Sequence, residues 1–369
     1  MKIMLASPYF RPRTGGLETY VEHLATGLAG EGHNVVVVCG DNVARVRRER
    51  DDGLTIYRLP IWRTLSNTPV DPRWPWWLRR IIATEDPDVL NAHAPVVFMV
   101  DAVALVAGRR PFVVTWHAAT LEKPAAPLLA AVTRGYGLAQ RLTFRRADRI
   151  VAVSPYVQRA LGRWSAKTRV VSNAVPAVGE PRSGAGQGLA FVASLRAAHS
   201  WKGLDLLLDA LAACRARFGS APALTVMGDG DDRPRYERRV AELGLADGTR
   251  FAGYVAPAER DRLLRGARAL VACPVTANDA FPTVLLDAWA QGVPVVASAI
   301  GPIPSLVDDG RTGLLVAPGD ADALAAALHR IATEDELASE LGEAGRRLVQ
   351  SRYTWPTQIA RMTAVLGEL

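Results

Sequence analysis

Two aspartates, Asp279 and Asp287, flank the point where a loop is expected to lead into a helix, in the segment NDAFPTVLLDAWAQGVPVVAS of residues 278–298. Pro282 suits the first helical turn, so the backbone N–H groups of residues 283–285 would be free to bind an anion, helped by the positive end of the helix dipole. Carboxylates on either side can accept hydrogen bonds from sugar hydroxyls. The segment therefore favours a ligand that combines phosphate with sugar, namely a nucleotide sugar.

The same acidic pair has a plainer interpretation. Carboxylates are common near the first turn of a helix, where they stay solvated and compensate the helix dipole. Short motifs of this kind also arise by chance. The segment must therefore be weighed together with the elements that would position it.

Short apolar runs alternate with helical patterns in the first half of the chain. The runs include KIMLAS (2–7), NVVVVCG (34–40) and PFVVTWH (111–117). Continuous apolar runs without polar alternation are typical of strands that are buried on both faces of a parallel sheet. The pattern predicts a doubly wound βα domain, which would bind its ligands at the carboxyl ends of the strands.

A second series of strands and helices follows a cluster of Gly, Pro and Ser. The cluster, residues 179–188, predicts a linker, and the new series begins with LAFVASL (189–195). We therefore expect an α/β chain of two Rossmann-like, doubly wound parallel-sheet domains that face each other across a cleft. The predicted domains are residues 1–180 and residues 181–353.

Composition narrows the class of protein. A chain of 369 residues, of which 49% are hydrophobic, is long enough for two domains with cores of their own. The longest apolar run, residues 96–108, contains an aspartate and is too short to span a membrane, and the N-terminus does not resemble a secretion signal. We therefore expect a cytoplasmic protein. The three cysteines, Cys39, Cys214 and Cys273, lack metal-site spacing and are expected in the core.

Basic residues are concentrated in the first half. Residues 1–180 contain 24 Lys or Arg and 15 Asp or Glu, whereas residues 181–369 contain 20 and 22. The basic half favours an anionic partner, such as the inner face of an anionic membrane or a phosphorylated acceptor, over nucleic acid. An arginine-rich composition alone would also produce this difference.

A cluster of aromatic and basic side chains lies in the same half. Such a combination suits an interface with anionic lipid, although ordinary packing of tryptophan explains it equally well. The cluster consists of Trp74, Trp76, Trp77, Arg73, Arg79 and Arg80.

A series of motifs runs in a fixed order through nearly the whole chain. The first half contains TGGLETYVEHLATGLAGEGHNVVVV, PDVLNAH, FVVTWH, ADRIVAVS and VVSNAV. The second half contains WKGLDLLLDAL, VMGDGDDRPRYERRVAELGL, RFAGYV, and AFPTVLLDAWAQGVPVVAS followed by GRTGLLVAPGD. In this order the motifs resemble those of glycosyltransferase family 4, which are retaining enzymes of the GT-B fold.

The resemblance implies a function and a place for the last helix. It implies a hexosyltransferase that moves a sugar, with retention, from a nucleoside-diphosphate sugar to an acceptor. The acceptor would be a lipid-linked or cell-envelope glycan or a small metabolite, held mainly by the basic first domain. The final segment, residues 354–369, resembles the closing helix of the family, which packs back onto the first domain.

Two cations would serve the leaving group. By resemblance Lys202, one of four lysines in the chain, would hold the diphosphate, whose growing negative charge needs fixed positive partners. Arg196 would be the second cation, although the family's arginine follows a glycine and VASL (192–195) stands there instead. A solvated surface arginine is the alternative. With the diphosphate neutralised in this way, neither a metal ion nor a cofactor is expected.

Three residues at the ends of the predicted strands complete the first-domain side. His117 matches a family position that contacts the transferred sugar near the reaction centre. His93 and Trp116 are expected on the acceptor side. For an isolated histidine, a place in the core is the usual alternative.

Glycines and one tyrosine would border the donor. Gly15 and Gly16 follow the first strand and would let a backbone N–H approach a phosphate or sugar, unless they form a plain tight turn. Gly228, Gly230 and Tyr254 would border the nucleotide base, with turns and packing as the alternative. Together the predicted donor-binding residues are Gly15, Gly16, Gly228, Gly230, Tyr254, Phe281, Pro282, Thr283, Val284 and Asp287.

The acidic pair departs from the family pattern. The family has two glutamates at this spacing, whereas both residues are aspartates here, and each is shorter by one methylene. Asp287 would still bind the ribose after a small shift of the ligand, whereas the contact of the catalytic Asp279 with the sugar would change in geometry. Two alternatives therefore stay open, a catalytically weakened nucleotide-sugar-binding partner subunit and a nucleotide-sugar epimerase.

Overall fold

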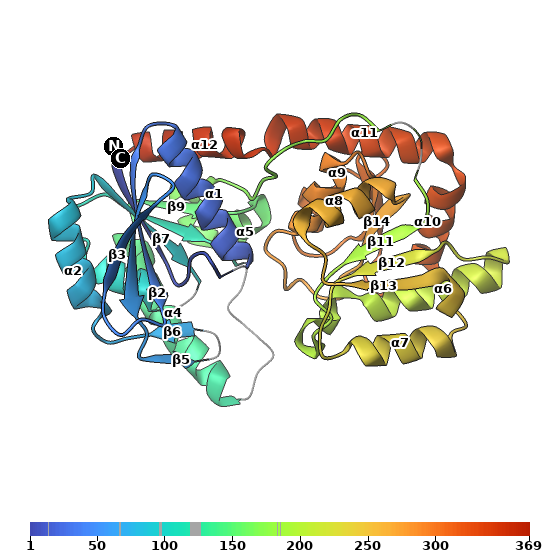
Figure 1. The fold of residues 1–369 in the computed structure, drawn as a ribbon, viewed down its shortest axis with the longest axis horizontal. Coiled ribbons are helices and arrows are strands. Elements are labelled where there is room, and N and C mark those ends of the chain that lie inside the picture. Colours follow the sequence, from blue (N-terminus) through green and yellow to red (C-terminus); the bar gives the residue numbers. More distant parts are fainter. Residues whose placement is uncertain (14, 66–67, 96–97, 119–126, 183, 185) are drawn as a thin grey trace. The chain divides into compact units, whose positions relative to one another are not determined.

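The computed structural model describes residues 1–13, 15–65, 68–95, 98–118, 127–182, 184 and 186–369. Within these residues the chain forms two compact units, which are coloured along the sequence in Figure 1. The first unit comprises Met1–Asn173 and Trp355–Leu369, and the second comprises Ala174–Thr354. Each unit is an α/β structure around a largely parallel sheet of its own, which confirms the predicted fold class.

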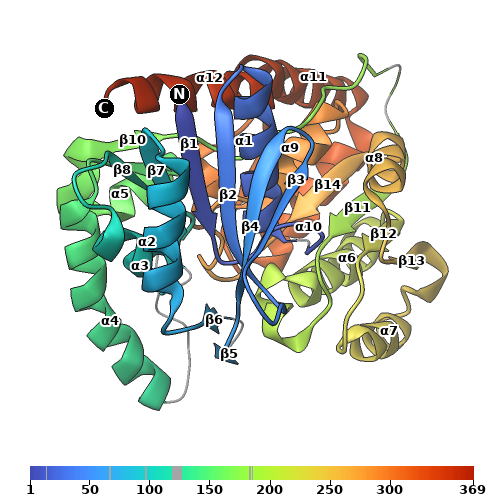
Figure 2. The same ribbon diagram turned by 60° about the vertical axis from the view of Figure 1, so that its left-hand side comes forward.

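The first unit is built on an eight-stranded sheet in the order β10-β9-β8-β7-β1-β2-β4-β3. Its strands are β1 (Lys2–Ser7), β2 (Asn34–Asp41), β3 (Arg47–Asp51), β4 (Leu54–Pro60), β7 (Val89–Ala94), β8 (Phe112–Trp116), β9 (Arg149–Ala152) and β10 (Thr168–Val170). Figure 2 shows β1, β2 and β4 side by side. All pairings are parallel except that of β3 with β4 at the edge. A separate hairpin joins β5 (Arg63–Leu65) to β6 (Thr68–Val70).

Helices cover the first sheet. They are α1 (Gly16–Gly30), α2 (Trp74–Glu85), α3 (Met99–Val106), α4 (Pro127–Arg146), α5 (Pro155–Ala160), the 3₁₀ helix η1 (Gly162–Lys167) and α12 (Trp355–Gly367). The last of these packs against α1, although more than 300 residues separate them along the chain. Gly27 permits this approach because a Cβ atom there would meet the side chain of Ile359.

The second unit is built on a six-stranded parallel sheet in the order β13-β12-β11-β14-β15-β16. Its strands are β11 (Leu189–Val192), β12 (Leu224–Met227), β13 (Thr249–Gly253), β14 (Ala269–Ala272), β15 (Val295–Ser298) and β16 (Gly313–Val316). Its helices are η2 (Ala197–Lys202), α6 (Leu204–Phe218), α7 (Arg233–Glu242), η3 (Ala246–Gly248), α8 (Pro257–Gly266), α9 (Thr283–Ala290), η4 (Ile303–Ser305), α10 (Ala321–Thr333) and α11 (Asp335–Arg352).

The two sheets share one topological feature. In each, the strand that comes first in the chain lies inside the sheet, since β1 lies between β7 and β2, and β11 lies between β14 and β12. The chain therefore leaves that strand toward one side and later returns to the other side. Open α/β sheets bind ligands at the carboxyl ends of the strands at such a switch point.

A close helix contact holds α11 against α9 in the second unit. Trp289 of α9 is fully buried, and its indole N–H donates to the Thr312 carbonyl oxygen at 2.8 Å. Gly345 of α11 lies against the same indole, so closely that a Cβ atom there would meet the ring. The contact explains why a glycine, a poor helix former, occupies the interior of α11.

We expect Gly345→Ala to destabilise the second unit. Alanine favours a helix over glycine by about 1 kcal/mol, but overpacking against a rigid indole costs roughly 1–3 kcal/mol. The urea midpoint should therefore fall. Gly266→Ala is the matched control, because a Cβ atom at this helical position meets nothing within 4 Å. An unchanged or higher midpoint for Gly345→Ala would contradict the contact.

Candidate functional site

A pocket lies at the carboxyl ends of β11 and β14, the switch point of the second sheet. Most of its walls are apolar, and Lys202 and Asp279 supply its charged groups. Its lining consists of Phe191, Val192, Ala193, Lys202, Val271, Ala272, Pro274, Thr276, Asp279, Pro282, Val284, Ile300, Pro302 and Ile303. An apolar pocket with a few convergent polar groups is typical of a small-molecule site.

The charged pair in this pocket is an ion pair. Lys202 Nζ donates to Asp279 Oδ2 at 2.6 Å, and the same ammonium lies 4.3 Å from the centre of the Trp201 ring. The second carboxylate oxygen of Asp279 accepts the N–H of Phe281 at 3.2 Å. The structure thus brings together the two residues to which the sequence assigns the diphosphate and the sugar. A phosphate that entered the pocket would compete with Asp279 for the ammonium.

The first turn of α9 borders the same pocket. Pro282 is the N-cap residue rather than the first helical residue, and α9 begins at Thr283. The N–H of Leu285 donates to the Pro282 carbonyl oxygen at 3.2 Å, so the prediction that it is free to bind an anion was wrong. The N–H groups of Thr283 and Val284 belong to the turn whose donors have no partner inside the helix. Phe281 and Pro282 are buried beside them.

Asp287 lies one turn further along α9 and has a partner that the sequence analysis missed. Its Oδ1 atom is 3.3 Å from an Nη atom of Arg260 on α8. Burial raises the pKa of Asp287 to about 6, while the charge of Arg260 lowers it and that of Asp261 raises it. The sequence signal for this pair was weak, because α8 carries several arginines and acids and nothing in their spacing selects Arg260.

The glycines after β12 have a packing role. The N–H of Gly228 donates to the Gly253 carbonyl oxygen at 2.8 Å, and its φ of 142° is unfavourable for other residues. A Cβ atom on Gly228 would meet the Ala193 carbonyl oxygen, and one on Gly230 would meet the backbone of Leu195. Both glycines therefore let the loop after β12 lie directly on the loop after β11.

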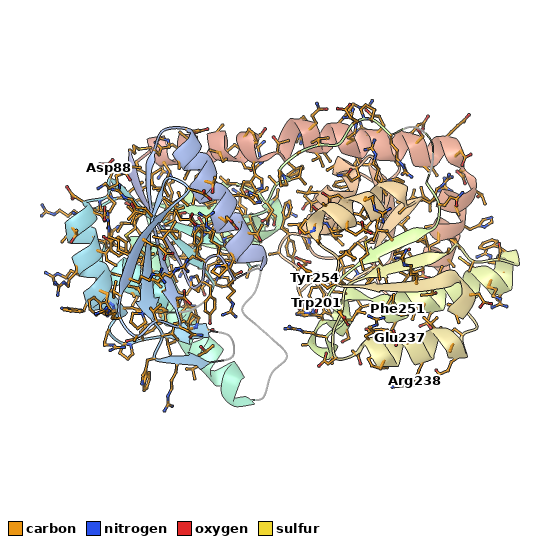
Figure 3. The ribbon with its side chains drawn as sticks, in the orientation of Figure 1. Asp88, Trp201, Glu237, Arg238, Phe251 and Tyr254 are labelled. Atoms are coloured by element: carbon orange, nitrogen blue, oxygen red, sulfur yellow. The ribbon has the colours of Figure 1, made fainter. Side chains whose placement is uncertain are left out.

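Arg196 and Tyr254 are exposed near these loops. Arg196 is the N-cap residue of η2, the short helix that ends at Lys202. Tyr254 follows β13 directly, is labelled in Figure 3, and has 81% of its surface exposed. Its ring is therefore free of packing and accessible to a planar ligand.

The glycine pair of the first unit lies at the start of α1. Gly15 is the N-cap residue in an extended conformation, and its carbonyl oxygen accepts the N–H of Thr19 at 2.9 Å. Gly16 is the first helical residue, and a Cβ atom there would meet nothing within 4 Å. The pair follows β1 at the switch point of the first sheet.

His93 and His117 form a pair in the first unit, in which His93 is buried and His117 is partly buried. His93 Nδ1 lies 3.1 Å from His117 Nε2, and the Tyr20 ring forms a T-shaped contact with each imidazole. Burial lowers the pKa of His117 to about 3 and that of His93 well below its usual value. Both rings are therefore neutral at physiological pH and act through hydrogen bonds rather than charge. His93 has no exposed surface, and Trp116 is buried against Phe144.

Three further observations concern the part of the chain that the structure describes. All three cysteines are free and buried. No group of three or more His, Cys, Asp or Glu side chains in the described ranges is arranged to hold a metal ion. None of the helices there has both the length and the apolar character that crossing a membrane requires.

Two family models of known proteins match this chain, one in each half. Residues 14–177 match the family model described as Glycosyltransferase Family 4, and residues 181–348 match that of Glycosyl transferases group 1. Together the models span nearly the whole chain. The chain is therefore a glycosyltransferase with the GT-B architecture of two Rossmann-like units. It belongs to glycosyltransferase family 4, as the motifs of the sequence indicated.

Individual proteins agree with this assignment. The chain is 29% identical to phosphatidyl-myo-inositol mannosyltransferase of Mycolicibacterium smegmatis, over 99% of this chain and 93% of that protein. It is 27% identical to glycogen synthase of Mycobacterium tuberculosis, over 99% and 94%. Among solved structures, HepE of Anabaena in complex with UDP superposes with a TM-score of 0.79, at 18% identity and full coverage of both chains.

We expect the buried carboxyl of Asp287 to make stability depend on pH. Its folded-state pKa is raised from 3.8, so its contribution is fully present below about pH 4 and is lost as the pH rises through about 6. A shift of this size corresponds to roughly 3 kcal/mol. Asp287→Asn should remove that component from the free energy of unfolding, measured by urea titration between pH 4 and 7.

An exposed aspartate in the same unit provides the control. Asp247→Asn removes one carboxylate from η3 without touching the pocket and should leave the pH profile as in the native protein. If the profiles of Asp287→Asn and the native protein run parallel across this range, Asp287 is not the titrating group.

Proposed function

We propose that this chain transfers a hexosyl group from a nucleoside-diphosphate sugar to an acceptor. The observation that carries the proposal is the pocket at β11 and β14, where an ammonium, a carboxylate and the first turn of a helix surround one space. An anion suits the ammonium and the helix start, and sugar hydroxyls suit the carboxylates. The UDP complex of HepE supports the same donor class.

In this proposal Lys202 of the pocket, together with Arg196, stabilises the leaving diphosphate. Lys202 would exchange Asp279 for a phosphate oxygen, and its charge would then oppose the charge that develops as the glycosidic bond to phosphate breaks. Arg196, at the other end of η2, would be the second cation. The α9 N–H groups of Thr283 and Val284 would complete the anion site. These groups supply the compensation that a divalent cation would otherwise give, so we propose that the reaction is metal-independent.

The freed Asp279 carboxylate would then face the sugar. It would accept hydrogen bonds from sugar hydroxyls, while Asp287 would hold the ribose. Retention would follow if the acceptor attacks from the side of the leaving group and a leaving-phosphate oxygen takes its proton. In the first unit, His117 would offer a hydrogen bond to the transferred sugar. Because its imidazole is neutral, it would do so without adding a charge to the site.

We expect Lys202→Met to lower turnover by roughly 10²–10³-fold, because a fixed charge that stabilises a developing anion is removed. The measurement is nucleoside diphosphate release from a panel of nucleotide sugars, each with several acceptors. Arg238→Gln is the control, because Arg238 is an exposed arginine on α7, labelled in Figure 3. The anomeric configuration of the product, read by NMR, tests retention directly.

The alternatives give different results in the same assay. If the folded native protein releases no diphosphate with any pairing and Asp279→Glu with Asp287→Glu restores release, the chain is a weakened partner subunit. If the donor sugar is interconverted without acceptor, it is an epimerase. A native enzyme that turns over and gains nothing from the glutamates supports the transferase.

We also propose that the first unit contacts an anionic membrane, where a lipid-linked acceptor would be found. An open groove between α2 and α3, of about 730 Å³, is lined by apolar side chains and arginines, among them Trp76, Arg79, Leu105 and Arg110. Trp76 and Leu105 are 52% and 76% exposed. The guanidinium of Arg80 lies 4.8 Å from the Trp76 ring.

Not every member of the aromatic and basic cluster belongs to this surface. Trp74 is fully buried, and its indole N–H donates to the Pro60 carbonyl oxygen at 2.9 Å, so it is a core residue. Arg73 is held by Asp71 at 2.6 Å. The exposed part, Trp76 with Arg79 and Arg80, presents an aromatic ring beside two positive charges, which suits a lipid headgroup region.

We expect the protein to bind phosphatidylserine-containing vesicles at low salt and to dissociate at high salt. Each arginine near an anionic surface contributes about 1 kcal/mol. The double variant Arg79→Gln/Arg80→Gln should therefore lose about 2 kcal/mol of binding free energy, so its affinity for the vesicles should fall at least tenfold. Arg238→Gln in the second unit is the control. No sedimentation with vesicles at low salt would reject membrane contact.

A further inference from the structure

The second unit contains another pocket, which is polar and lies at the opposite end of the strands from the pocket with Lys202 and Asp279. Its lining includes Arg182, Arg268, Gly292, Ser339 and Glu343. Arg268 immediately precedes β14 and Gly292 lies shortly before β15, so the pocket is at the amino ends of these strands. The pocket with Lys202 and Asp279 is at their carboxyl ends. The two pockets are therefore separate sites in one unit.

Arg268 is the most constrained side chain of this second pocket. Only 6% of its surface is exposed. Its Nε atom donates to the Ile331 carbonyl oxygen at 2.6 Å, and Nη1 donates to Asp335 Oδ1 at 2.5 Å. The remaining nitrogen, Nη2, is buried and has no hydrogen-bond partner among the described residues. A buried charged donor without an acceptor is costly, so this group has unused capacity to bind an anion.

Arg182 adds a second guanidinium to the pocket. It donates to the Ala267 carbonyl oxygen at 2.7 Å, which fixes it beside the residue that precedes Arg268. Its pKa is lowered by burial and by the positive charges of Arg265 and Arg268. Like charges that are held together in a partly buried place repel each other, and an anion between them would relieve this repulsion.

The one carboxylate in the lining does not supply that anion. Glu343 is bound by Arg346, whose Nε and Nη2 atoms donate to its two oxygens at 2.8 and 3.1 Å. Both oxygens are thus engaged by a third arginine. Ser339, one turn earlier on α11, provides an exposed hydroxyl at the same pocket. Hydroxyl and guanidinium groups together suit a tetrahedral oxyanion.

We propose that this pocket binds a phosphate-class oxyanion, as inorganic phosphate or as the phosphate of a small metabolite. Two arginine forks and a serine hydroxyl would hold it. The chain enters the second unit through the segment that carries Arg182 and leaves it through α11, which carries Ser339 and Glu343. A bound phosphate would therefore link the first and the last segments of the second unit. It would lie at the amino ends of the strands, away from the pocket with Lys202 and Asp279.

The test is calorimetric titration of the Lys202→Met variant with inorganic phosphate, so that the cation of the donor pocket does not contribute. We expect binding to persist in this variant. Adding Arg182→Gln should weaken it roughly tenfold or more, because a charge-assisted hydrogen bond is removed, whereas adding Arg238→Gln should leave it unchanged. Loss of all binding in Lys202→Met, or equal affinity after Arg182→Gln, would overturn the proposal.

A second variant covers the case in which Arg182→Gln does not fold. Ser339→Glu places a negative charge at the exposed side of the pocket and should weaken phosphate binding while the urea midpoint stays the same. Unchanged affinity in this folded variant would also count against the site. Glucose 6-phosphate distinguishes the two sources: tighter binding than phosphate indicates a phosphorylated metabolite, and weaker binding indicates phosphate itself.

Discussion

The pairing of β11 with β14 is the constraint on which the second unit depends. These strands are separated by almost 80 residues, yet Leu189 and Ala190 pair in parallel with Ala269 and Leu270. The pairing sends β12 to one side of β11 and β14 to the other, so that no crossover covers the carboxyl ends between them. Lys202 reaches this place from the β11 side and Asp279 from the β14 side. The position of the pocket is thus set by the order of the strands, and the side chains then determine what it can bind.

Charge compensation stabilises the pocket that contains Lys202 and Asp279. Lys202 pairs with Asp279, and Arg260 pairs with Asp287, so each carboxylate near α9 has a cation within reach. A partly buried charge without a partner would be costly. A ligand that brings both phosphate and hydroxyl groups can take over both halves of an ion pair, since phosphate replaces the carboxylate and hydroxyls replace the ammonium. A simple anion would satisfy Lys202 alone and leave Asp279 unpaired.

The sequence predicts what depends on local pattern and misses what depends on distant partners. The apolar run Val35–Val38 is buried throughout, as expected for an inner parallel strand, and α9 lies where the acidic segment placed it. The edge strand β3, RRERD, is largely exposed and gives no apolar signal in the sequence. It is a strand because its backbone pairs with β4, and the sequence of β3 does not reveal that pairing. The Arg260–Asp287 pair and the unsatisfied Arg268 depend on which helices pack together, which no spacing in the chain specifies.

The C-terminal helix shows why the chain must return to its first unit. Trp355, at the start of α12, packs edge-on against Tyr20 at 5.5 Å, and the Tyr20 ring packs in turn on His117 at 4.8 Å. The side chain of Gln358 accepts the N–H of Ser172 at 2.8 Å. Residues from the end of the chain therefore pack against Tyr20, the ring that borders both His93 and His117. A first unit without α12 would expose Tyr20 and admit water to the imidazole pair, which would raise the pKa of both histidines toward their ordinary range. The helix therefore contributes to the electrostatic environment of these histidines as well as to the packing of the unit.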